Sequence, residues 1–129
     1  MTLDEALAIS LERSLSRGEY AKLCAFAGGE AASSWDALAI GVAQRYLRGE
    51  VTFVAADSFM NALWSFVIFD GQPSPVMTRV YEAFDDGEYH HPGDAPDVDP
   101  EVAYTRPLLA ALLPEEPLPN KSLERTRVG

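Results

Sequence analysis

The stretch TFVAADSFMNALWSFVIFDG, residues 52–71, decides the fold that the sequence predicts. Its large apolar side chains recur at the three- and four-residue spacing of a helix, at Phe59, Leu63 and Phe66. Its polar side chains form one narrow line, made by Asp57, Asn61 and Ser65. A helix that is apolar over most of its circumference is buried on most sides. The stretch therefore predicts the central helix of a helical domain.

Both ends of this helix carry recognisable signals. Thr52 supplies an N-cap hydroxyl, and Asp70-Gly71 supplies the glycine that commonly follows a helix. The segment FVIF, residues 66–69, is also compatible with a buried strand, because Phe, Val and Ile favour strands. The uninterrupted helical spacing through Phe66 favours the helix.

Three helices are predicted before the central one. The first begins at Thr2, which has capping-box spacing from Glu5, and its leucines recur every four residues up to Gly18. The second is short and ends at Gly28-Gly29. The third is capped by Ser33 and ends at Arg48-Gly49, where the helix dipole favours basic residues.

Two more helical segments are predicted after the central helix. Ser74-Pro75 opens a helix that ends at Gly87. Asp99 caps a last helix, which Pro107 either breaks or bends. The sequence thus predicts an all-α, single-domain bundle of five to six helices over residues 1–113, with an acidic loop before the last helix. A proline-rich segment without periodicity, residues 114–129, is expected to be a mobile tail.

The charge of the chain limits its partners. Twenty acidic residues against ten basic ones give a formal net charge of −10, which repels phosphate backbones and anionic lipids and attracts basic protein surfaces. Direct binding of nucleic acid is therefore disfavoured. No apolar run is long enough to cross a bilayer, and no signal peptide is evident. A cytoplasmic location is expected.

Catalytic signatures are lacking in the sequence. The single cysteine, Cys24, has apolar neighbours and reads as a small buried hydrophobe, which fits a reducing compartment. The glycine pair at 28 and 29 is not followed by a GK[ST] motif, and no serine has a GxSxG context. We therefore expect a protein that is not an enzyme and that needs no cofactor.

Carboxylates are concentrated in one part of the chain. Eight occur in the twenty residues from Glu82 to Glu101, with no lysine or arginine between Arg79 and Arg106. Tyr89 lies among them, beyond the glycine that ends its helix, and is expected to be an exposed aromatic residue of the kind that anchors an interface. This pattern indicates either a recognition surface for a basic protein or a solvated acidic connection. The candidate partner-binding residues are Asp85, Asp86, Glu88, Tyr89, Asp94 and Asp97.

A metal site is the competing hypothesis for the same region. His90 and His91 lie among carboxylates, and these two side-chain types together can hold a transition metal. Adjacent histidines in a loop generally point apart, so solvated histidines are the alternative interpretation. Asp97, Asp99 and Glu101 alternate as in part of a calcium loop, but the glycine and closing acid of an EF-hand are missing.

Two segments resemble a known family. Residues 46–64, YLRGEVTFVAADSFMNALW, look like small bacterial immunity proteins of the colicin-D-immunity-like type, with a helix that ends on glycine, a capped turn and a further apolar helix. Residues 80–89, VYEAFDDGEY, are similar to the acidic helix end of such proteins, and the resemblance covers at most residues 41–113. It implies an acidic helical protein that plugs the basic active site of a nuclease-type toxin. It assigns no inhibitory residue.

Charge and resemblance together favour a non-enzymatic acidic binding protein. The leading hypothesis is an immunity or inhibitor protein that blocks the basic surface of a nuclease-type toxin or of another nucleic-acid enzyme. One alternative is a metal-dependent enzyme or metal-binding protein that uses His90, His91 and neighbouring carboxylates. Another is a helical subunit of a larger complex.

Overall fold

The computed structural model describes residues 1–13, 15–26 and 31–113, and within these ranges it contains helices, turns and loops but no strand. The helices are, in chain order, α1 (Leu3–Ser10), α2 (Arg17–Phe26), α3 (Ala31–Leu47), α4 (Phe53–Asp70), α5 (Pro75–Asp86), the π-helical turn η1 (Glu101–Thr105) and α6 (Arg106–Leu112). The predicted all-helical bundle is confirmed. Because α4 runs unbroken through residues 66–69, the strand alternative is wrong.

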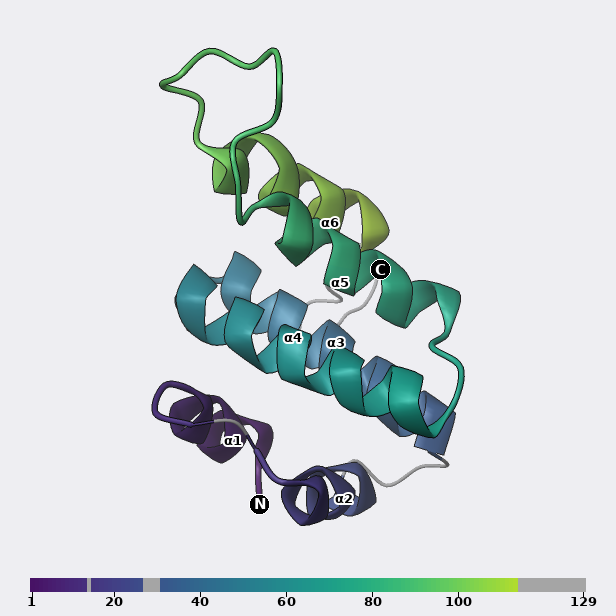
Figure 1. Ribbon diagram of the computed structural model, residues 1–129. Coiled ribbons are helices and arrows are strands. Elements are labelled where there is room, and N and C mark those ends of the chain that lie inside the picture. The colour runs from purple at the N-terminus through teal and green to yellow at the C-terminus, as the bar shows by residue number, and fades with distance from the viewer. Residues whose placement is uncertain (14, 27–30, 114–129) are drawn as a thin grey trace, which may run out of the picture.

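The helices pack in three layers (Figure 1). One outer layer holds α1 and α2, the middle layer holds α3 and α4, and the other outer layer holds α5, η1 and α6. Both α3 and α4 contact α5, and α1 contacts α4, so the middle layer is covered on both sides. The green loop after α5 projects beyond the layers before the chain returns through η1.

The centre of the core comes from α4, as its apolar circumference predicts. Its fully buried side chains include Phe59, Met60, Leu63 and Val67. The neighbouring helices contribute Tyr46 from α3 and Phe84 from α5, whose rings meet edge to face with centroids 5.4 Å apart. One continuous core therefore joins the layers.

Three predicted helix starts are confirmed by side-chain hydrogen bonds. Thr2 and Glu5 form a reciprocal capping box at α1, with bonds of 3.1 and 2.8 Å. The hydroxyl groups of Thr52 and Ser74 accept hydrogen bonds from first-turn N–H groups of α4 and α5, at 3.1 and 3.0 Å. Each bond satisfies a backbone donor that the helix leaves unpaired, so these starts are fixed by local chemistry.

The first helix ends earlier than predicted. Helix α1 stops at Ser10, and the chain turns instead of continuing as a helix to Gly18. A second capping box explains the break, because Ser16 and Glu19 exchange side-chain-to-backbone bonds of 3.1 and 2.7 Å at the start of α2. Gly18 lies in the first turn of α2. The leucine repeat hid the break because Leu15 is buried although it lies outside a helix.

The third helix begins before its predicted cap. Helix α3 starts at Ala31, so Ser33 lies within the first turn and not at the N-cap. Ala31 and Ala32 are strong helix formers, which accounts for the earlier start. The predicted end is confirmed, because α3 stops at Leu47 and Gly49 takes a left-handed conformation with φ 77°.

The last helix continues through its proline. As predicted, Asp99 caps its start, with Oδ1 accepting a 3.0 Å hydrogen bond from the Glu101 N–H. The π-helical turn η1 lies directly before Pro107, and the Arg106 N–H donates to the Glu101 carbonyl oxygen. This wider turn changes the hydrogen-bond register just ahead of the residue that has no N–H. The chain therefore passes into α6 instead of leaving the helix.

The end of α5 packs directly on η1. Thr105 is fully buried, and its hydroxyl donates a 2.7 Å hydrogen bond to the Ala83 carbonyl oxygen. A methyl group added at Gly87 would come within 2.0 Å of the Thr105 hydroxyl oxygen and 3.0 Å of the Phe53 ring. Gly87 is thus required by this close approach, which sets where the acidic loop leaves the domain.

Some expectations concern other parts of the chain. The predicted terminator at Gly28-Gly29 and the predicted mobile tail, residues 114–129, lie outside the described residues. Within residues 1–13, 15–26 and 31–113, no helix combines the length and the apolar character that crossing a membrane requires.

Candidate functional site

The acidic segment, residues 82–101, begins in the last turns of α5, crosses the acidic loop at residues 87–99 and ends in η1. The ion pairs within the described ranges join Arg13 to Glu19, Arg45 to Asp4 and Arg48 to Glu50. Each lies elsewhere in the molecule. No arginine of the described ranges is therefore ion-paired with a carboxylate of the acidic segment.

Three rings hold the acidic loop, and we call them the ring stack: Tyr89, His91 and Tyr104. The centroid of the His91 ring lies 4.4 Å from that of Tyr89 and 3.8 Å from that of Tyr104, at interplanar angles of 21° and 28°. Since two rings cannot stack on one face, His91 lies between the tyrosines. Its Nε2 is 2.8 Å from the Asp86 carbonyl oxygen. The loop is thus joined to both α5 and η1.

Two acids of the segment accept hydrogen bonds from tyrosines. The Tyr104 hydroxyl donates to Asp94, and the Tyr46 hydroxyl donates to Glu101. Burial, and then the bond to Glu101, raise the pKa of Tyr46, so this hydroxyl remains a proton donor. A neutral donor leaves the charge of its carboxylate in place. These bonds therefore order the segment without cancelling its charge.

The polar line of α4 meets the acidic segment at a carboxylate cluster, formed by Asp57, Asp85 and Glu88 around Asn61. The Asn61 Nδ2 donates to Glu88 Oε2 at 2.9 Å and to Asp57 Oδ2 at 3.4 Å. The other Asp57 oxygen, Oδ1, is buried and has no hydrogen-bond partner among the described residues. The cluster therefore brings α4 together with both α5 and the start of the acidic loop.

Crowding changes the protonation of this cluster. Burial, and then the neighbouring Glu88 and Asp85, together raise the pKa of Asp57 to about 8. Burial also raises the pKa of Asp85, and the charges of Glu88 and Asp86 add to that shift. Asp57 is consequently largely protonated at neutral pH, and the cluster carries less negative charge than its composition implies.

An aromatic pair borders the carboxylate cluster. Trp64 of α4 and Tyr81 of α5 stack with ring centroids 4.2 Å apart and an interplanar angle of 8°. Burial raises the pKa of Tyr81, and the charges of Asp85 and Glu88 add to this effect, so its hydroxyl lies close to the cluster. Both rings are half-buried and cover the seam between α4 and α5.

The six predicted partner-binding residues fall into two groups. The exposed ones are Glu88, Tyr89 and Asp97, and the half-buried ones are Asp85, Asp86 and Asp94. The Tyr89 side chain is 49% exposed, in agreement with the prediction of an accessible aromatic residue. Asp85 and Asp86 are half-buried because the end of α5 packs against α4 and η1.

The two histidines occupy different environments. His90 is exposed, as the interpretation of a solvated loop histidine predicts, whereas His91 is half-buried in the ring stack. No group of three histidine, cysteine or acidic side chains is placed to hold a metal ion within residues 1–13, 15–26 and 31–113. The metal hypothesis for His90 and His91 therefore gains no third ligand in this part of the chain.

The sequence reading missed the role of Asp57 and of Tyr104. Asp57 was recognised only as part of a polar line, although a carboxylate four residues before Asn61 in a strongly apolar helix signals a polar contact that another element must complete. No sequence pattern points to Tyr104. Its partners His91 and Asp94 lie in the preceding loop, where no helical spacing relates them to Tyr104.

No protein-family model matches the chain, and neither a curated protein nor a solved structure matches it. The resemblance of residues 46–64 and 80–89 to colicin-D-immunity-like proteins stays a prediction.

Proposed function

We propose that this chain is a non-enzymatic binding protein whose acidic surface docks on a basic surface of another protein. The partner class that suits this charge is a nuclease-type toxin or another nucleic-acid enzyme, which the chain would block as an immunity or inhibitor protein. Such enzymes present cations where phosphates bind. Carboxylates held at those positions would exclude the nucleic acid.

The observation that carries the proposal is an acidic loop that is ordered and remains charged. Glu88 and Asp97 are exposed, and no ion pair within the described ranges includes them. The ring stack and the bond from Tyr104 to Asp94 hold the loop in place. A loop that is ordered before binding loses less conformational entropy when the partner arrives. Uncancelled negative charge also speeds the encounter with a basic surface.

Tyr89 adds apolar contact area to this surface. One face of its ring stacks on His91, while 49% of the side chain stays accessible. Aromatic residues that are held rigidly at a surface often contribute much of an interface's binding energy. We therefore place Tyr89 at the centre of the proposed contact, with Glu88 on one side and Asp97 further along the loop.

The test starts from a protein that the full chain captures from its native host. Binding of the purified partner is then measured by calorimetry over a range of salt concentrations. We expect Asp97→Lys to weaken binding at low salt about tenfold or more and to reduce the salt dependence, because it reverses a charge within the proposed contact. Because Asp97 is exposed, we expect the substitution to leave the fold intact.

The matched control is Glu12→Lys, which makes the same change of charge at an exposed position after α1. This variant is expected to retain affinity within about twofold, because salt screens distant charges. Equal losses of affinity in both variants would show that binding depends on the net charge of the chain and not on the position of Asp97. A partner without a basic surface, or binding that salt does not affect, would contradict the proposal.

A further inference from the structure

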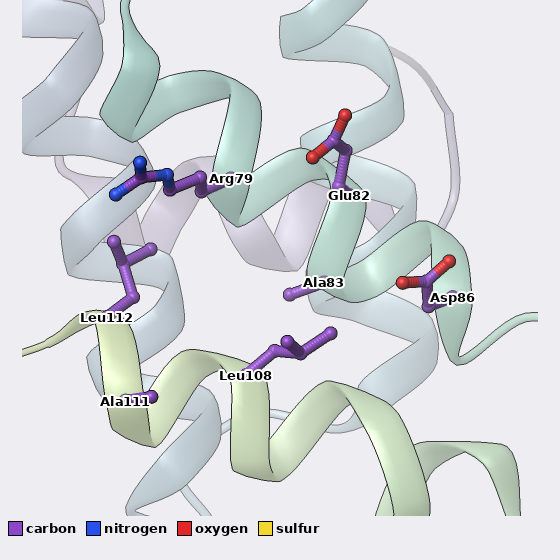
Figure 2. A pocket seen from close by; sticks show the side chains of 7 residues that line it. All are labelled: Arg79, Glu82, Ala83, Asp86, Leu108, Ala111 and Leu112. Atoms are coloured by element: carbon purple, nitrogen blue, oxygen red, sulfur yellow. The ribbon is translucent and has the colours of Figure 1, made fainter.

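A groove between α5 and α6 has an apolar floor and charged ends (Figure 2). It is lined by Arg79, Glu82, Ala83 and Asp86 of α5 and by Leu108, Ala111 and Leu112 of α6. On each helix these residues recur at spacings of three and four, so each set occupies one helix face. The groove holds a volume of about 310 Å³.

The floor of the groove suits an aliphatic side chain. Leu108 and Leu112 point from α6 toward α5, and the small side chain of Ala83 points back toward Leu108 (Figure 2). Leu108 is 45% exposed, and Ala111 is exposed as well. Large side chains at the edges and small ones between them leave room for a side chain from outside, and covering Leu108 would remove apolar surface from water.

The ends of the groove differ in charge. Arg79 lies toward the Leu112 end, and Asp86 lies toward the Leu108 end (Figure 2). Asp86 lies seven positions after Arg79 in the sequence, which corresponds to about 10 Å along the helix. With Glu82 between them, the rim carries one more negative than positive charge. The backbone of Asp86 also holds His91, so the groove directly continues the acidic surface.

We infer that this groove binds an amphipathic helical segment of the basic partner, with an aliphatic side chain over Leu108 and a cation beside Asp86. The inference rests on the proposed function and specifies which part of the partner the groove recognises. Helices bind such grooves through residues at three- and four-residue spacings, which is also the spacing of the lining residues. At the Leu112 end of the groove, Arg79 favours an acidic side chain of the bound segment. The two ends of the groove therefore select which end of the segment binds where.

The charge of the molecule argues against a second copy as the occupant. Two chains with a formal charge of −10 repel each other over the distances at which an encounter forms. A basic segment instead gains from the same field. The partner's segment still needs an apolar face. A segment that is polar on all sides would leave the floor of the groove in contact with water, or would place its cations against leucine side chains.

The experiment uses the full chain and two labelled synthetic helical peptides of lysine, alanine and glutamate with equal length and charge. One peptide has leucines along one face, and the other has glutamines at those positions. By fluorescence anisotropy we expect the leucine peptide to bind about tenfold more tightly. Leu108→Gln and Ala111→Trp should each remove this advantage, the first by losing apolar surface and the second by filling the groove. Neither should change binding of the glutamine peptide.

Val102→Gln is the matched control, because Val102 is 59% exposed on η1 and does not line the groove. This variant should keep the full advantage of the leucine peptide. Salt-dependent binding of both peptides with equal affinity would overturn the groove inference and leave the proposed function standing. Absence of binding by either peptide at low salt would contradict both.

Two further measurements identify a different occupant. A dimer in sedimentation that Ala111→Trp dissociates would assign the groove to a second copy and overturn the inference. A larger advantage of the leucine peptide over the equally charged glutamine peptide in a full chain with Lys121, Arg125 and Arg127 replaced by Gln would assign the groove to the chain's own C-terminal residues, with the same consequence. A monomer in which these three replacements leave the ratio of the two peptide affinities unchanged supports the inferred occupant.

Discussion

Three carboxylates of the first fifty residues, Asp4, Glu19 and Glu50, are held in a different way from those of the acidic segment. Their partners are arginines, and the hydrogen bonds from Arg13, of 2.7 and 2.8 Å, are the main reason why the pKa of Glu19 falls to about 2. In the acidic segment the donors are the neutral side chains of Tyr46, Asn61 and Tyr104. A cation holds a carboxylate by cancelling its charge, whereas a neutral donor leaves the charge in place. The molecule can therefore order an acidic surface and keep it negative.

The same contrast appears in the direction of the pKa shifts. The pKa of Glu19 lies below its ordinary value because a guanidinium stabilises the charged form. The pKa of Asp57 lies above its ordinary value because burial and neighbouring carboxylates disfavour the charged form. The carboxylate cluster thus concentrates charge at the expense of stability, and its most buried member, Asp57, responds by holding a proton.

The largest expected effect breaks the junction that positions the acidic segment. Gly87→Ala would place a methyl group 2.0 Å from the Thr105 hydroxyl oxygen, so α5 and η1 must move apart. We expect a loss of about 2 to 3 kcal/mol in the free energy of unfolding, measured by urea denaturation. Gly18→Ala is the control, because only the Ser16 hydroxyl lies within 4 Å of the added atom, at 3.9 Å. A parent-like stability of Gly87→Ala would show that the junction relaxes freely.

The second effect uses pH to change the charge of the cluster. The pKa of Asp57 is about 8 in the folded protein, against an ordinary value of 3.8, so the folded state binds the proton more tightly. The resulting stabilisation is complete below about pH 4 and is lost as the pH rises toward about 8. Asp57→Asn should therefore be more stable than the parent by about 1 to 2 kcal/mol at pH 9, a value reduced for the solvent access of this half-buried group.

Urea denaturation at pH 5, 7 and 9 checks this prediction, with the difference between Asp57→Asn and the parent growing as the pH rises. Glu12→Gln removes an exposed carboxylate outside the cluster and should show a difference that does not change over this range. A difference for Asp57→Asn that is constant with pH would mean that Asp57 is already ionised at neutral pH.

A smaller effect is expected from the ring stack. His91→Ala removes two ring contacts and the polar contact to the Asp86 carbonyl oxygen, and should lower the free energy of unfolding by about 1 kcal/mol. Hydrogen exchange should become faster in residues 87–99 and stay unchanged in α4. His90→Ala is the matched control, since His90 is exposed. Unchanged exchange in His91→Ala would show that the loop is held without the stack.

The smallest effect is expected where arginine cancels charge at the surface. Asp4 pairs with Arg45 at 2.8 Å, but its side chain is 74% exposed. Asp4→Asn should change the free energy of unfolding by less than about 0.5 kcal/mol, because solvent and salt screen such pairs. Thermal unfolding at low and high salt measures the change. A loss comparable with that of His91→Ala would mean that this arginine pair contributes as much to the free energy of unfolding as the ring stack does.

Local signals made much of the fold predictable. Thr2, Thr52 and Ser74 each satisfy a backbone donor within their own helix, so their positions follow from neighbouring residues. The error at the first helix has the same origin. The leucine repeat through Leu15 and the capping box at Ser16 are both local, and the box prevailed.

The candidate site could be predicted only in part. Its charge is visible in the sequence, because the acids from Glu82 to Glu101 are close together along the chain. The carboxylate cluster is not visible, because Asn61 and Glu88 are 27 residues apart and meet only once α4 and α5 have packed. Which acids are exposed and which are half-buried depends on that packing, and not on sequence spacing.

The ring stack gives the acidic loop a built-in spectroscopic reporter. The imidazole of His91 lies between two tyrosine rings, so the circulating electrons of both rings shield its carbon-bound protons. Its proton resonances should appear well upfield of those of His90, which lacks this sandwich among the described residues. A partner that binds or displaces the loop would shift these resonances. One-dimensional nuclear magnetic resonance can therefore detect binding at the proposed surface without any label.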